Sequence, residues 1–200
     1  MKNMYYKQIP GWISDDEANE LYKLAFDLNG NILEIGTLYG KSTSCICEAI
    51  RDSNLKSTFD SCDINFKNRD DFLNFYHPIH GQDTRIPVLL EEISFSKNKD
   101  IYEVTIEYLE KFNLLQFVNL IPESFHIFEK KYNFIFCDAL HDINEININL
   151  PHLLRLSDDM CILAIHDINS VINFIPSTFN DKKIIFLKTV GNLGIYNITS

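Results

Sequence analysis

The chain has 200 residues, of which 46% are hydrophobic and 23% are charged, a composition typical of one globular domain with its own core. The formal net charge of −10 disfavours a nucleic-acid partner, because binding to a phosphate backbone requires a basic face. No apolar run reaches the roughly 18 residues that a membrane-spanning helix needs, and residues 1–6 do not resemble a signal peptide. We therefore expect a cytoplasmic protein that acts on a small molecule, with neither nucleic acid nor membrane as a partner.

The first expected element is an N-terminal helix over residues 14–28, after a turn at Pro10-Gly11. Ser14 and Asp15 are both suitable N-caps, because their side chains can accept a hydrogen bond from a free N–H group of the first turn. Apolar residues then recur every three or four positions as far as Leu28, which is the period of an amphipathic helix.

A short strand, a loop with two glycines and a second helix come next. The strand is Ile32–Ile35, which is apolar except for Glu34, and the helix is expected over Thr43–Arg51. The loop between them contains Gly36 and Gly40. A strand, a glycine turn and a helix in this order build a small-molecule site at the carboxyl end of a strand in α/β sheets.

The loop shares its last letters with a phosphate-binding P-loop, G-x-x-x-x-G-K-[ST]. Only three residues separate Gly36 from Gly40, however, and the carboxylate of Glu34 would repel a triphosphate. What remains, E-x-G-x-x-x-G-x-S, resembles motif I of the class I S-adenosylmethionine-dependent methyltransferases. This resemblance implies a cofactor that is cationic and has no phosphate, and an acid in the loop suits such a ligand. Lys41 is then expected to face solvent. A shortened P-loop and an ordinary strand-to-helix turn stay open as alternatives.

Strands and helices alternate along the rest of the chain. Further strands are expected at 58–64, 117–121, 133–138 and 161–166, and further helices at 101–112, 125–131 and 144–156. The segments 183–190 and 193–198 flank Gly191-Asn192, a hairpin signal. The order predicts one α/β domain over residues 1–200, with a doubly wound, mostly parallel, seven-stranded Rossmann-like sheet that ends in an antiparallel hairpin.

One segment, at about residues 64–100, is longer than a crossover between two strands requires. It is rich in aromatic residues, which argues against disorder, and it contains Pro78, Gly81 and Pro87 as helix breakers. We expect an irregular insert that caps the substrate side of the domain. The insert and the C-terminal hairpin offer surfaces for a homodimer.

Four of the predicted strands have an acidic residue at or directly after their carboxyl end: Glu34, Asp63, Asp138 and Asp167. The carboxyl ends of parallel strands meet at one rim, where ligands bind. Asp63 is placed to accept the ribose hydroxyls of an adenosine, and Ser124 to lie along its adenine. Glu34 would anchor the loop or bind an amino group of the cofactor, and Ser42 would donate to its carboxylate.

The last two strand ends also carry histidines. Asp138 and Asp167 with His166 could ligate a divalent cation, and oxygen-rich ligands suit Mg²⁺ or Mn²⁺. His141 is expected to act as a general base, because the ordinary pKa of imidazole is near neutrality. For each histidine, a structural role as a helix cap is the alternative.

With these residues in place, the chain resembles the class I S-adenosylmethionine (SAM)-dependent methyltransferases. Within them it is similar to small bacterial O-methyltransferases, the branch with macrolide sugar O-methyltransferases and cephalosporin-hydroxylase-like proteins, related to catechol O-methyltransferase. The resemblance runs from Ile32 to the C-terminus and rests on residues 34–43, on 134–138 with His141, and on 165–167. Three places depart from the pattern of that branch: Ala139-Leu140, Ser157-Asp158-Asp159 and His166.

The motifs and the resemblance together define the candidate site. The candidate cofactor-binding residues are Glu34, Gly36, Thr37, Gly40, Ser42, Asp63, Ser124 and Asp138. The candidate catalytic residues are Asp138 and His141, and the candidate metal ligands are Asp138, His166 and Asp167.

The expected function is SAM-dependent O-methylation of a small hydroxylated metabolite or sugar, with SAM and Mg²⁺ or Mn²⁺ as cofactors. The first alternative is a SAM-fold binding or assembly protein without catalysis, and a less favoured one is an atypical P-loop nucleotide kinase.

Overall fold

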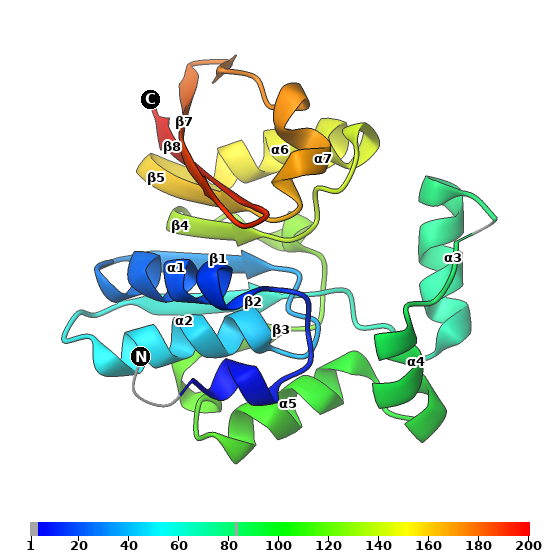
Figure 1. The fold of residues 1–200 in the computed structure, drawn as a ribbon. Coiled ribbons are helices and arrows are strands. Elements are labelled where there is room, and N and C mark those ends of the chain that lie inside the picture. The colour runs from blue at the N-terminus through cyan, green and yellow to red at the C-terminus, as the bar shows by residue number, and fades with distance from the viewer. Residues whose placement is uncertain (1–3, 83) are drawn as a thin grey trace.

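The computed structural model describes residues 4–82 and 84–200, and it contains one sheet flanked by helices (Figure 1). The strands are β1 (Asn31–Ile35), β2 (Thr58–Cys62), β3 (Asn119–Ile121), β4 (Tyr132–Cys137), β5 (Ser157–Ile165), β6 (Thr178–Phe179), β7 (Lys182–Val190) and β8 (Leu193–Thr199). The α-helices are α1 (Asp15–Phe26), α2 (Lys41–Asp52), α3 (Arg69–His80), α4 (Val88–Ile93), α5 (Ile101–Lys111), α6 (Ile143–Leu156) and α7 (Ile168–Val171).

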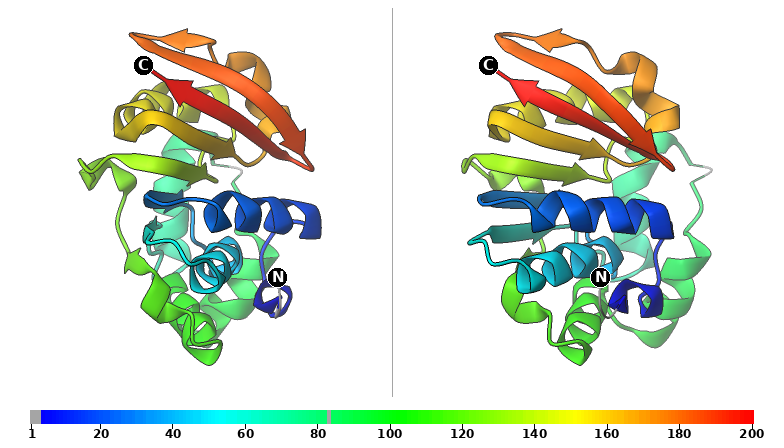
Figure 2. Two further views of the ribbon diagram at one scale, coloured as in Figure 1. Left: turned by 90° about the vertical axis from the view of Figure 1, so that its left-hand side faces the viewer. Right: turned by 60° about the vertical axis from the view of Figure 1, so that its left-hand side comes forward.

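The sheet has the strand order β3-β2-β1-β4-β5-β8-β7-β6. Strands β1 to β5 pair in parallel, and β8 inserts antiparallel between β5 and β7. Figure 2 shows the C-terminal strands continuing the same sheet. The predicted α/β class, doubly wound parallel sheet and antiparallel hairpin are confirmed. The sheet has eight strands instead of seven, because β6 is only two residues long and such a strand leaves no pattern in the sequence.

Side chains of the central strands are buried on both faces of the sheet. In β4, Phe134 and Phe136 belong to one core, with α1, α2 and α5, while Ile135 and Cys137 belong to the other, with α6 and α7. Figure 1 shows α1 and α2 in front of the sheet and α6 behind it. Helices on both faces explain why these strands are apolar throughout rather than alternating.

Helix α1 begins directly after Ser14, one of the two expected N-caps. The Ser14 hydroxyl accepts a hydrogen bond from the Glu17 N–H group, and the Glu17 carboxylate accepts one from the Ser14 N–H group at 2.6 Å. This capping box stabilises the first turn. It also leaves the other oxygen of Glu17 free to reach the C-terminal hairpin.

The insert at about residues 64–100 contains the helices α3 and α4, so the expected irregular conformation was wrong for these parts. Asn68 caps α3 by accepting the Asp71 N–H group, and α4 follows a few residues after α3 ends. Pro78 lies in the last turn of α3 and does not prevent the helix. In Figure 1, α3 and α4 stand beside the edge of the sheet to which β1 and β4 point, which is the edge that carries the acidic residues.

Two predicted elements are shorter in the structure. Residues 125–131 form only a 3₁₀ turn, Phe125–Ile127, and β3 begins at Asn119 because Leu115–Phe117 is a 3₁₀ turn as well. None of the helices in the described ranges is long and apolar enough to cross a membrane.

Candidate functional site at the carboxyl edge of the sheet

Glu34, at the end of β1, is completely buried and accepts three hydrogen bonds. The donors are the hydroxyls of Ser42 at 2.5 Å, Thr43 at 2.5 Å and Ser61 at 2.6 Å. Ser61 in turn lies 2.6 Å from the hydroxyl of Thr37. One carboxylate therefore ties together the end of β1, the first turn of α2, strand β2 and the glycine loop.

This network changes the roles predicted for three residues. Glu34, Ser42 and Thr37 are buried, and their polar atoms bond to one another and to Ser61. Of the two roles considered for Glu34, the geometry favours anchoring the loop over binding the cofactor. The expected donation from Ser42 to the cofactor is replaced by its donation to Glu34.

The loop from Gly36 to Gly40 connects the end of β1 directly to the start of α2. Gly36 has a φ of +94°, and a Cβ atom there would lie 2.8 Å from the carbonyl oxygen of Asp138. A side chain therefore fits neither the backbone conformation nor the close contact between the ends of β1 and β4. Gly40, with a φ of +84°, closes the turn by donating its N–H group to the Thr37 carbonyl at 2.8 Å.

The loop is not a P-loop. The Leu38 N–H group, one of the amides that would have to bind phosphate, donates to the Asp63 carboxylate at 2.6 Å. The Lys41 ammonium group donates to the Gly11 carbonyl at 3.0 Å and so is held by the N-terminal segment. The expectation that Lys41 faces solvent was wrong, and the kinase alternative loses its phosphate-binding lysine.

Backbone hydrogen bonds bring the strand ends together. The N–H groups of Gly36, Asp138 and His166 donate to the last residues of β2, β1 and β4, respectively, at 2.8 to 3.0 Å. As a result, Asp63, Asp138 and Asp167 all reach the same edge, as the sequence predicted. Burial raises the pKa of Asp63 to about 6, although the N–H groups of Leu38 and Ile64 partly offset this effect.

Two adjoining cavities open at this edge, with volumes of about 290 Å³ and 630 Å³. Both are lined by Gly36, Asp63, Phe66, Tyr76, Asp138 and His141. The first cavity extends to Ser124, whose hydroxyl lies 2.8 Å from Nδ1 of His126, and the second extends to Trp12. Their size is that of sites for cofactors and small substrates.

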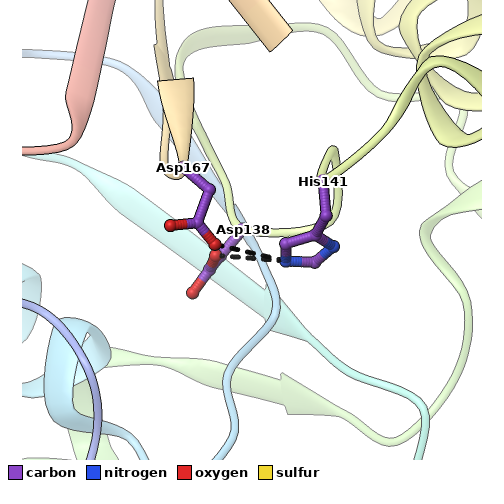
Figure 3. A group of neighbouring side chains, drawn as sticks. All are labelled: Asp138, His141 and Asp167. Carbon is purple, nitrogen blue, oxygen red and sulfur yellow. Dashed lines mark ion pairs between the residues drawn. The ribbon is translucent and has the colours of Figure 1, made fainter. Parts of the chain in front are cut away.

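Asp138, His141 and Asp167 converge (Figure 3). All three line the larger cavity, and Asp138 and His141 also line the smaller one. Nε2 of His141 lies 3.7 Å from Oδ1 of Asp138 and 3.9 Å from Oδ2 of Asp167. The other ring nitrogen, Nδ1, lies 2.8 Å from the Glu145 carboxylate, which also accepts the His141 N–H group. Glu145 therefore fixes the ring so that Nε2 faces the two aspartates.

Electrostatic coupling in this cluster is strong. Burial opposes the charge of His141, but the nearby Asp138 carboxylate and the hydrogen bond with Glu145 outweigh burial and raise the pKa of His141 to about 10. Burial likewise opposes the charge of Asp138, but bonds to His141 and His166 lower its pKa to about 2. These partners favour the protonated form of His141. A protonated imidazole cannot accept a proton, so the raised pKa of His141 argues against the predicted general base.

His166, which we predicted to be a metal ligand, is buried beside this cluster but is not one of its three converging residues. Its Nδ1 lies 3.1 Å from Oδ1 of Asp138, and its Nε2 lies 3.7 Å from Glu17. Among the residues that the structure describes, the set able to hold a cation contains His141 where we expected His166. His166 instead orients Asp138 through the contact between its Nδ1 atom and Oδ1 of Asp138.

The C-terminal hairpin also supports the cluster, through Asp167. The side-chain amide of Asn192 donates to Oδ1 of Asp167 at 2.5 Å, and its backbone N–H group donates to Glu17 at 2.5 Å. The Ile168 N–H group returns a bond to the Asn192 carbonyl at 3.0 Å. Asp167 has a φ of +54°, and these bonds hold it in that conformation.

Sequence reasoning did not assign Glu17, Glu145, Tyr76 or Asn192 to the site. Glu145 follows His141 by four residues, and this spacing at a helix start was a usable signal. Tyr76 was visible only as one aromatic residue of the insert. Glu17 and Asn192 are 175 residues apart, and no local pattern predicts their contact.

Comparison with known proteins gives the family. The family model described as a methyltransferase domain matches residues 33–168, more than half of the chain. The chain therefore belongs to the methyltransferase-domain family, and it is a SAM-dependent methyltransferase, as the motifs predicted. No curated protein matches it in sequence.

Solved structures of methyltransferases share the fold at low identity. A methyltransferase from Geobacter sulfurreducens has a TM-score of 0.60 at 14% identity, over 95% of this chain and 82% of that one. The O-methyltransferase TomG from Streptomyces achromogenes, solved with SAM, has a TM-score of 0.57 at 13% identity, over 94% and 82%. An O-methyltransferase from Bacillus cereus, solved with S-adenosylhomocysteine (SAH), has a TM-score of 0.56 at 18% identity, over 100% and 88%.

The buried Glu34 predicts a pH dependence of stability. Burial raises its pKa from 4.5 to about 7, despite the three hydroxyl donors. Its favourable contribution is therefore complete below pH 4.5 and is lost as the pH rises through 7. Relative to Glu34→Gln, the free energy of unfolding of the wild type should fall by roughly 3 kcal/mol across that range.

Urea denaturation of both proteins at several pH values measures this difference. Asp63 titrates in the same range but is present in both proteins, so only its electrostatic coupling to Glu34 contributes to the difference. A difference that does not change between pH 4.5 and pH 8 would show that Glu34 does not titrate as described.

Proposed function

We propose that this enzyme transfers the methyl group of SAM to a hydroxyl of a small hydroxylated metabolite or sugar. The observation that supports this most is that Asp138 and His141 line two cavities that share Gly36 and Asp63, and that Asp167 converges with them at the larger one. Side-chain oxygen and nitrogen atoms at that point can orient an acceptor hydroxyl next to a cofactor bound at the loop. The acidic net charge supports a small acceptor over RNA or DNA.

In this proposal the cofactor lies along the ends of β1, β2 and β3. Asp63 accepts the Leu38 N–H group and lines both cavities, so a ribose hydroxyl bound there would reach its carboxylate. Gly36 allows the ligand to approach the backbone, and Ser124 lines the far part of the first cavity, where the adenine would lie. The carboxylates of the edge complement the positive sulfonium group.

Catalysis would come mainly from positioning. Methyl transfer requires the acceptor oxygen, the methyl carbon and the sulfur in line, and fixing this geometry removes much of the barrier. Tyr76 of α3 lines both cavities and helps to cover the reacting groups from water. His166 and Asn192 fix Asp138 and Asp167 from behind, so neither carboxylate has to reorganise during the reaction.

The cluster also fits a divalent cation. Two carboxylates and one imidazole nitrogen are suitable donors for Mn²⁺ or Mg²⁺, and Glu145 holds the second ring nitrogen as carboxylates do behind many metal-bound histidines. When bound, such a cation would lower the pKa of an acceptor hydroxyl. His141 would act as a ligand through Nε2, and it would have to release its proton for that role.

Cofactor binding has a direct thermal test. SAM or SAH at about 100 times its Kd should raise the Tm by about 5 to 10 °C, whereas Mg-ATP should not change it. Asp63→Asn should weaken SAM binding by at least about tenfold, because the ribose loses a charged acceptor. Differential scanning fluorimetry with a SAM titration measures both effects.

Lys41→Ala is the matched control for the same loop. Its ammonium group bonds to Gly11 and not to the cavity, so the SAM-induced shift should stay that of the wild type. A shift with Mg-ATP alone, or its loss in Lys41→Ala, would instead support nucleotide binding.

Metal binding is tested separately, without an acceptor. Mn²⁺ should bind the wild type with an affinity that rises with pH, because the raised pKa of His141 makes a proton compete for Nε2. Asp138→Asn should abolish this binding, and Asn192→Ala should weaken it by about tenfold through Asp167. Isothermal titration calorimetry between pH 6 and pH 8 provides the measurement.

Asn169→Ala is the control for the hairpin contact. Asn169 bonds to Asn192 but not to Asp167, so its loss should leave the Mn²⁺ affinity within about twofold. Binding that is unchanged in Asp138→Asn would place the metal elsewhere.

A further inference from the structure

We infer that the acceptor is an uncharged or cationic hydroxylated molecule with an apolar face, and that phosphorylated, carboxylated and coenzyme A-linked acceptors are excluded. This inference rests on the proposed methyl transfer and concerns the same two cavities. It follows from the charged residues that line the two cavities and from the aromatic side chains that form part of their walls.

The lining is acidic. Its carboxylates are those of Glu17, Asp63, Glu123, Asp138, Glu145 and Asp167. Among the described residues that line either cavity, there is no lysine or arginine. The sulfonium cofactor would add one net positive charge and a divalent cation two, so the carboxylates would still outnumber these cations.

The lining histidines do not supply a site for an anion. His141 lies 2.8 Å from the carboxylate of Glu145, His166 lies 3.7 Å from that of Glu17, and both also face Asp138, so carboxylates already balance their positive charge. Burial and the nearby Arg155 lower the pKa of His126, which therefore stays neutral at pH 7. An anionic acceptor would have to bury its charge among carboxylates with no lysine or arginine to pair with it, and such burial is strongly unfavourable.

Another part of the cavity lining is aromatic rather than acidic, and it is formed by side chains of the insert. Ring centroids lie 5.2 Å apart for Phe66 and Phe72, and 4.7 Å apart for Phe72 and Tyr76. All three rings line the larger cavity, together with Trp12. Such faces bind planar or apolar groups and attract cations, but they offer nothing to a phosphate or a carboxylate.

The test uses methyl-tritiated SAM and bacterial metabolites divided by ion exchange at pH 7 into cationic, neutral and anionic pools. The wild type should label the cationic or neutral pool at least about tenfold faster than the anionic pool. Label found mainly in the anionic pool would overturn the inference. If SAM binds but no pool is labelled, the proposed methyl transfer itself is wrong. The inference about the acceptor, which rests on that transfer, is then wrong as well.

A variant pair tests whether charge is the cause. Trp12 is 59% exposed, so Trp12→Arg can introduce the missing cation at the cavity without disturbing the core. Transfer to the anionic pool should rise at least about fivefold in Trp12→Arg relative to Trp12→Gln, which removes the same ring without adding charge. Equal transfer by the two variants would contradict the electrostatic argument.

Discussion

The site depends on one buried carboxylate. Glu34 accepts hydrogen bonds from Ser42, Thr43 and Ser61, and it thereby fixes β1, α2 and β2 relative to one another. A buried carboxylate is unfavourable unless it is fully bonded, so the three hydroxyls and the acid belong to one unit. The rigidity of the Gly36–Gly40 loop, and hence the position of Asp63 against Leu38, follows from this unit.

From this anchored loop, the site extends to residues that are distant in sequence. Glu17 of the first helix and Asn192 of the last hairpin meet behind the cluster, and between them they hold His166 and Asp167. The site is thus supported from both ends of the chain. This arrangement explains why Gly191, in the hairpin turn, is a glycine: a Cβ atom there would lie 2.5 Å from Glu17.

Much of this could be predicted from the sequence, and the limits have physical causes. The alternation of strands and helices was readable because central strands are apolar and helix starts are capped. Acidic residues at strand ends were readable because parallel strands end at one edge. The exchange of His166 for His141, and the inward turn of Ser42 toward Glu34, depend on side-chain directions that spacing does not determine. The helical insert was missed because Pro78 was given too much weight.

In the proposed function, the ends of β1, β2 and β3 form the cofactor site of this methyltransferase, next to the cluster that includes Asp138 at the end of β4. A crystal structure of the protein with SAH tests it most directly. We predict that the ribose hydroxyls lie within hydrogen-bond distance of Asp63, with Gly36 against the ligand and the sulfur facing Asp138, His141 and Asp167. SAH bound away from Asp63, or with its sulfur turned from that cluster, would contradict the account.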